Sequence, residues 1–202
     1  FTGGFSFVER KQPFVNQITH RTNHSNSLVN NYVNRLLEDR NGNLWFATNN
    51  GVSYWDKPAD RWTTFFQDRQ DGASVFLALC EDDEGNIWAG TYSSGVYVLD
   101  KRTGKVLEHH FHEKDERDFS VRFVRDIYKD SQGNIWIGGT NNVICFLKEE
   151  KAFRVYDPQP VNSVGELPSG KMLLACSNGL LSLDKNTGEY QYLLENCFVQ
   201  DV

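Results

Sequence analysis

A ten-residue segment recurs four times along the chain, and this repeat limits the possible folds more than any other feature of the sequence. The copies are Asp39–Thr48, Asp82–Thr91, Asp130–Gly139 and Leu167–Cys176. Successive copies, measured at Gly42, Gly85, Gly133 and Gly170, are 43, 48 and 37 residues apart. A period near forty residues is typical of proteins that repeat one supersecondary unit, so the fold must be sought among repeat architectures.

The first complete unit is predicted to be a meander of four short strands. These strands cover Val33–Glu38, Leu44–Thr48, Val52–Trp55 and Arg61–Phe66. Asn41-Gly42, between the first two, offers two residues that accept positive φ, which is a strong hairpin signal. The second strand is apolar on both faces, so each unit must pack against a neighbour on both sides.

Four-stranded meanders of this length predict an all-β fold, a β-propeller fragment. The whole chain, 1–202, is one part of a larger domain, with blades at about 28–67, 74–113, 121–157 and 161–195. The ends are predicted partial blades, 1–18 and 197–202. Gly4–Val8 resembles the third strand of a unit, and Cys197–Val202 resembles a first strand. No stretch of useful length shows helical periodicity.

The repeated glycines and tryptophans are interpreted as framework. The set is Gly42, Trp45, Gly51, Gly85, Trp88, Gly95, Gly133, Trp136, Gly170 and Gly179. The tryptophans hold one position in three successive units, where a ligand-stacking residue would not be expected. We therefore predict that the glycines form turns and that the tryptophans pack blade against blade. The fourth unit has Leu173 at this position and lacks the asparagine after Gly170.

Charge and hydropathy argue against two kinds of partner. The chain has 202 residues, a formal net charge of -6 and no dense Lys/Arg run, whereas nucleic-acid binders usually carry a basic patch. No apolar run approaches the ~18 residues of a membrane span. We expect this segment to contact neither nucleic acid nor membrane directly. The sequence lacks both a signal peptide and an initiating methionine, so we expect it to be part of a longer protein.

The cysteines show no CxxC pair and no metal-ligand spacing. They are Cys80, Cys145, Cys176 and Cys197. Three of them occupy positions where other units carry strand residues, so small buried hydrophobic side chains are expected. A disulfide remains an alternative, and the cysteines alone do not define the compartment.

No catalytic, metal or cofactor site is predicted. The histidines of His109-His110-Phe111-His112 lie on a predicted outer strand, where a surface metal site is an alternative but a complete ligand set is not evident. His20 and His24 lie in a polar connection and receive no ligand role. Ser93-Ser94-Gly95 is a turn, not the strained elbow that presents a nucleophilic serine.

Candidate ligand-binding residues lie where the first strand of each unit enters the central channel. They are Tyr32, Asn34, Arg35, Arg122 and Arg125, together with Tyr92 in an expanded middle turn of the second unit. Arginine and tyrosine suit anionic or glycan ligands, through forked hydrogen bonds and stacking.

Three segments, GNLWFATNNGVSYWD, GNIWAGTYSSGVYVLD and GNIWIGGTNNVICFL, closely resemble the two-component regulator propeller repeat. Ser27–Asp39 resembles the opening strand of that repeat. The resemblance implies the periplasmic sensor region of a Bacteroidetes hybrid two-component system. The parent would be anchored in the inner membrane, with tandem seven-bladed propellers, an immunoglobulin-like domain, a histidine kinase, a receiver and a DNA-binding domain.

The same resemblance implies that the chain itself is not an enzyme, whereas its parent is a sensor histidine kinase. Expected partners are an oligosaccharide, the remaining blades and domains, and a second receptor copy in a homodimer. The output would be control of polysaccharide-utilisation genes. Two alternatives stay open: a propeller lyase or hydrolase with a site at the channel mouth, and a scaffold that only mediates dimerisation.

Overall fold

The computed structural model describes residues 17–69, 74–110, 123–140, 142–156 and 159–202, and its sixteen strands form four antiparallel sheets of four. The first sheet contains β1 (Val33–Glu38), β2 (Leu44–Thr48), β3 (Gly51–Asp56) and β4 (Arg61–Phe65). The second contains β5 (Phe76–Glu81), β6 (Asn86–Thr91), β7 (Val96–Asp100) and β8 (Val106–His110). The third contains β9 (Val124–Lys129), β10 (Ile135–Gly139), β11 (Val143–Leu147) and β12 (Ala152–Tyr156). The fourth contains β13 (Val161–Glu166), β14 (Met172–Cys176), β15 (Gly179–Leu183) and β16 (Tyr190–Glu195).

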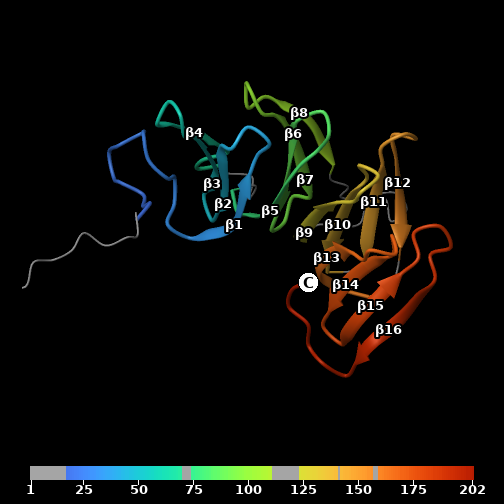
Figure 1. The fold of residues 1–202 in the computed structure, drawn as a ribbon. Coiled ribbons are helices and arrows are strands. Elements are labelled where there is room, and N and C mark those ends of the chain that lie inside the picture. The colour runs from blue at the N-terminus through green and yellow to red at the C-terminus, as the bar shows by residue number, and fades with distance from the viewer. Residues whose placement is uncertain (1–16, 70–73, 111–122, 141, 157–158) are drawn as a thin grey trace, which may run out of the picture.

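The four sheets follow one another around an arc, as blades of a β-propeller (Figure 1). The first strands β1, β5, β9 and β13 lie on the concave side, and we call them the inner strands. The last strands β4, β8, β12 and β16 lie on the convex side. Strand order within every sheet is the order in the chain, so each blade is the meander that the sequence predicts.

Each blade begins with a tight hairpin, and its chemistry is visible in the first. The Gly42 amide donates to the Asp39 carbonyl at 2.8 Å, and the Asp39 amide donates to the Asn43 carbonyl at 2.9 Å. Gly42 has φ +79°, but Asn41 is not among the described residues with positive φ. The expectation of two positive-φ residues is therefore wrong. The turn needs one left-handed residue, and glycine fills it without steric cost.

The repeated tryptophans pack between blades. Trp45 is fully buried in a cluster with Phe76 and Tyr97 of the next sheet. Trp88 lies among Val124 and Ile127 of the third sheet, and Trp136 lies among residues of the fourth, including Val161 and Val164. Three hydrophobic cores thus alternate with the four sheets, and each tryptophan supplies the largest side chain of its core.

The aspartate before each hairpin is the hydrogen-bond partner of the tryptophan. Indole Nε1 donates to the aspartate Oδ2 at 3.2 Å for Trp45 and Asp39, and at 2.9 Å for Trp136 and Asp130. Trp88 and Asp82 are joined in the same way, at 3.0 Å. These carboxylates are buried, so their role is to complete the blade core as well as to cap the turn.

The fourth blade replaces this pair as a unit. Leu167 stands in the place of the aspartate and Leu173 in the place of the tryptophan. Since a buried indole N–H needs an acceptor and a buried carboxylate needs donors, losing both together leaves no orphaned group. The fourth copy of the repeat therefore forms the same hairpin with an apolar pair, Leu167 and Leu173, in place of the hydrogen-bonded one.

The two chain ends differ from expectation in one respect. The C-terminal segment 197–202 lies beside β13, but it is not a strand. A first strand pairs with the second strand of its own blade, and none of the described strands pairs with 197–202 in this way. Of the predicted partial blade 1–18, residues 1–16 lie outside the described residues.

The buried cysteines behave as small hydrophobic side chains. Cys80, Cys145 and Cys176 are buried and Cys197 is partly buried, and all four are free thiols in the structure. Burial raises the pKa of Cys80, Cys145 and Cys176 to about 12. Within the described ranges, no helix is long and apolar enough to cross a membrane.

Candidate functional site

Every inner strand carries one extra residue near its start, at the end of the blade opposite the hairpin. In β1 the register passes from Val33 opposite Thr48 to Arg35 opposite Ala47, so Asn34 has no partner on β2. The corresponding bulged residues are Leu77 in β5, Arg125 in β9 and Asn162 in β13. A β-bulge re-aims a side chain and is frequent beside binding sites. We call this end of the inner strands the mouth end.

The four bulged residues line two adjoining hollows at the mouth end, which together we call the mouth groove. The larger, about 320 Å³, is lined by Asn34, Leu77, Phe123, Arg125, Asn162 and Gln200. The smaller, about 160 Å³, is lined by Asn34, Arg35, Leu77, Arg125, Asn162, Ser163, Gln200 and Asp201. The groove therefore joins side chains from all four blades and from the C-terminal segment.

Amide side chains connect each bulge to the next blade. Asn34 Nδ2 donates to the Phe76 carbonyl at 2.8 Å and to Asn49 Oδ1 at 2.9 Å. Asn162 Nδ2 donates to the Val199 carbonyl at 2.7 Å. Val199 thus takes, relative to β13, the position that Phe76 takes relative to β1. The lining residues are fixed by the same contacts that join neighbouring blades.

A buried carboxylate below the groove connects three blades. Asp126 on β9 is 3% exposed and forms an ion pair with Arg35 of β1. Its Oδ2 accepts from the Val164 amide of β13 at 2.9 Å and lies 3.1 Å from Ser163 Oγ. The ion pair fixes the guanidinium at one side of the groove.

The structure brings three of the six predicted ligand residues together in the groove: Asn34, Arg35 and Arg125. Tyr32 stands just before β1 and is 72% exposed. Tyr92 is 57% exposed and meets the Phe123 ring edge-on, at 4.8 Å between centroids, so it borders the larger hollow through Phe123. Arg122 lies outside the described residues. The binding role of all six remains a prediction.

Sequence reasoning did not identify Leu77, Phe123, Asn162, Gln200 or Asp201 as lining residues of the groove, or Asp126 as the carboxylate beneath it. The signal was available in the inner strands. Val33-Asn34, Phe76-Leu77, Val124-Arg125, Val161-Asn162 and Val199-Gln200 align at one repeat position. Its second residue varies freely while its neighbours follow the repeat, which is the pattern expected of residues that face a ligand rather than a core.

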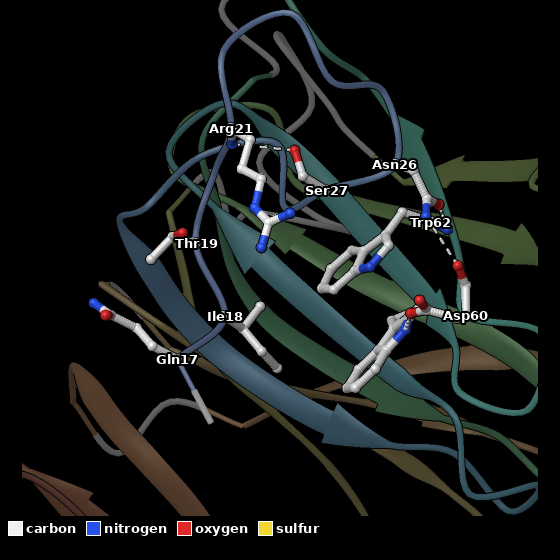
Figure 2. A pocket seen from close by; sticks show the side chains of 9 residues that line it. Gln17, Ile18, Thr19, Arg21, Asn26, Ser27, Asp60 and Trp62 are labelled. Atoms are coloured by element: carbon white, nitrogen blue, oxygen red, sulfur yellow. Dashed lines mark hydrogen bonds between the residues drawn. The ribbon is translucent and has the colours of Figure 1, made fainter. Parts of the chain in front are cut away.

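A separate hollow of about 210 Å³ lies on the first sheet, between the segment 17–27 and the stacked rings of Trp55 and Trp62. Figure 2 shows Ile18 and Arg21 on one side of it and Trp62 and Asp60 on the other. Strand register makes Trp55 the equivalent of Leu99 and Leu183, which pack against the preceding blade. Trp55 therefore occupies a position that packs blades together in the other units. For this reason we favour the mouth groove over this hollow as the candidate ligand site.

The histidines have structural surroundings. His109 stacks on Tyr97 at 3.9 Å, and His110 stacks on Trp88 at 5.6 Å. Burial lowers the pKa of His110. His20 Nδ1 lies 2.7 Å from the Leu28 carbonyl, and His112 lies outside the described residues. Among the described residues, no group of three or more His, Cys, Asp or Glu side chains could hold a metal ion.

Comparison with known families identifies the repeat. The family model described as two component regulator propeller matches residues 27–50, 71–93 and 118–141. These three segments are similar to two component regulator propeller repeats. The matched segments fall in the first three blades and include their hairpins and tryptophans. The fourth blade, with leucines in place of the Asp–Trp pair, shows how far the repeat can drift while keeping its strand order.

Solved structures with the same fold include extracellular domains from B. thetaiotaomicron. The extracellular domain of the putative hybrid two component system BT3049 matches at TM-score 0.72 and 22% identity, over 92% of this chain and 25% of that one. That of BT4673 matches at TM-score 0.64 and 19% identity, over 81% and 22%. This chain thus spans about a quarter of the length of these neighbours. No curated protein sequence matches it.

Proposed function

We propose that this chain is part of the extracytoplasmic ligand-sensing propeller of a hybrid two-component sensor histidine kinase. The matched repeat family and the description of both structural neighbours as extracellular domains of hybrid two component systems support this role. In this proposal the parent protein is anchored in the inner membrane and the propeller lies in the periplasm. The chain contributes recognition, and the kinase lies elsewhere in the parent.

The ligand we propose is a glycan fragment bound in the mouth groove, with polysaccharide-utilisation genes as the regulated output. The supporting observation is the set of bulged side chains, because they converge from four blades on one groove and comprise two amides, an apolar side chain and a guanidinium. Asn34, Asn162 and Gln200 supply amide donors and acceptors, and Phe123 supplies apolar surface. Sugars need this combination of planar polar groups and aromatic carbon. Signalling would proceed through a receptor homodimer.

Calorimetry on the protein at its natural length, against a panel of neutral and acidic oligosaccharides, tests this proposal. A ligand that binds only the folded state also raises the melting temperature, which gives a second readout. We expect at least one oligosaccharide to bind without being cleaved, as judged by chromatography of the recovered sugar. Cleavage would favour the lyase or hydrolase alternative, and failure of every sugar to bind would favour the dimerisation scaffold.

A further inference from the structure

The larger hollow of the mouth groove contains one positive charge among neutral side chains, and this charge affects which ligands the hollow can bind. Among its lining residues, Arg125 is the single charged side chain, and the others are apolar or carry neutral amides. Both aspartates lie toward the smaller hollow or beneath it. The two hollows therefore present different chemistry to the same bound chain.

In the smaller hollow the positive charge of Arg35 is already balanced. Asp126 pairs with Arg35, and the Asp126 side chain is only 4% exposed, whereas that of Arg35 is 35% exposed. Asp201 adds a second carboxylate, whose Oδ1 accepts from Ser163 Oγ at 2.8 Å. An anionic ligand group placed here would meet Asp201, so this hollow suits hydroxyl groups.

Arg125 is held differently. One guanidinium nitrogen donates to the side-chain oxygen of Asn162, a neutral acceptor, and the guanidinium carbon lies 5.3 Å from the centroid of the Phe123 ring. Its Nε is buried without a hydrogen-bond partner among the described residues. No carboxylate is among its described hydrogen-bond or ion-pair partners. Asn162 and Phe123 thus orient the guanidinium without neutralising it, and the nearest carboxylate of the groove, Asp201, lines the smaller hollow.

We propose that the larger hollow selects an oligosaccharide bearing a carboxylate or sulfate group, and that Arg125 is the residue that determines this specificity. The inference rests on the glycan-binding function proposed above and adds the class of sugar. A guanidinium fork matches the planar geometry of a carboxylate and the oxygen spacing of a sulfate. The neutral amides then bind hydroxyl groups of the adjoining sugar units.

Isothermal titration with matched pairs of sugars tests the proposal on the protein at its natural length. The carboxylate pair is a galacturonate trisaccharide and its methyl ester, and the sulfate pair is a sulfated galactose disaccharide and its unsulfated parent. We expect the acidic member of at least one pair to bind about tenfold or more tightly than its neutral partner. Its affinity should fall as salt rises from low to moderate concentration.

Variants assign the effect to Arg125. Arg125→Gln should remove the preference for the acidic sugar, and Arg125→Lys should retain part of it, because lysine keeps the charge but loses the fork. Arg102→Gln, in the exposed turn between β7 and β8, is the matched control and should change nothing. If Arg125→Gln lowers the melting temperature, a second pair of variants replaces it. Leu77→Glu places a negative charge in the groove from another blade and should weaken binding of the acidic sugar, whereas the neutral Leu77→Gln should not.

The outcomes separate the two proposals. Equal binding of acidic and neutral members, or a preference that survives both Arg125→Gln and Leu77→Glu, overturns the inference and leaves glycan sensing intact. Binding of no sugar at all overturns glycan sensing and the inference with it. Loss of the acidic preference in Arg125→Gln, with neutral sugars bound as before, supports both.

Discussion

The two ends of the inner strands obey opposite rules. At the hairpin end, three blades repeat the same buried pair of aspartate and tryptophan, with nearly the same Nε1–Oδ2 distance. At the mouth end, the bulged position holds asparagine, leucine, arginine and asparagine in turn. Positions that are repeated between blades therefore stabilise the packing of the blades, and positions that vary between them are available for ligand recognition.

The contacts between neighbouring hairpins lie between these two extremes, because the positions in contact repeat from blade to blade but the residue types change. The Arg40 amide donates to Glu81 Oε2 at 2.7 Å between the first two blades. Between the next two the charges are exchanged, and Lys129 Nζ donates to Asp83 Oδ1 at 2.8 Å. Between the last two, the Ser131 amide donates to Glu166 at 2.7 Å. The same two repeat positions are in contact at all three junctions, but the carboxylate is on the later blade in the first and last and on the earlier blade in the middle one.

The largest expected effect is at the hairpin end. Trp136→Ala should lower the free energy of unfolding by about 3–5 kcal/mol, because it empties the core between the third and fourth blades. Urea denaturation measures this, with Tyr92→Ala as control. Tyr92 is exposed, so its removal should cost no more than about 0.5 kcal/mol. Equal costs for the two variants would contradict the division between the ends.

The mouth end contains one residue expected to behave as framework. Asp126→Ala should cost about 2–3 kcal/mol, since it leaves the Val164 amide without its acceptor and Arg35 without its charge partner. Arg125→Ala, one position earlier, should cost much less. Chemical denaturation of the two variants tests the contrast, and a larger loss for Arg125→Ala would refute it.

The fourth blade provides a test of the buried pair. Asp130→Leu and Trp136→Leu together reproduce Leu167 and Leu173, so the double variant should be more stable than the sum of the single losses implies. A coupling energy of about 1–2 kcal/mol is expected from a double-mutant cycle, because Asp130→Leu alone leaves the buried Trp136 N–H without its acceptor, and the second change removes that N–H. Strictly additive losses would mean that the hydrogen bond contributes nothing.

The smallest effect concerns the charges between the second and third hairpins. Hydrogen bonds from Lys129 and Lys148 lower the pKa of Asp83 to about 2. A carboxyl group with a depressed folded-state pKa stabilises the fold above its ordinary value near 4, and this contribution is lost as pH falls through about 2. Asp83→Asn should therefore flatten the decline in melting temperature between pH 4 and pH 2. An unchanged slope would count against this ion pair, which is partly exposed and screened by solvent.

The blade architecture was predictable because its determinants are local and repeated. Gly42 and its equivalents define turns, and Trp45 and its equivalents define packing, so four copies reinforce one another. The groove was harder to predict because it depends on bulges that shift the register by one residue. Asn34 and Arg125 were found from their place at the start of a strand, whereas Leu77 and Gln200 lack a conspicuous side chain. The contact between Arg35 and Asp126 crosses two blades, and no sequence period encodes it.

The central claim is that residues at the hairpin end of the inner strands determine the stability of the fold, whereas residues at the mouth end determine ligand binding. The most direct test measures, on one protein preparation each, the unfolding free energy and the dissociation constant for the best-bound acidic oligosaccharide in Arg125→Gln and Asp130→Asn. We predict that Arg125→Gln weakens binding about tenfold or more with little change in stability, and that Asp130→Asn lowers stability while its folded fraction binds normally. If both variants lost affinity and stability together, or if the two effects were exchanged, the account would be wrong.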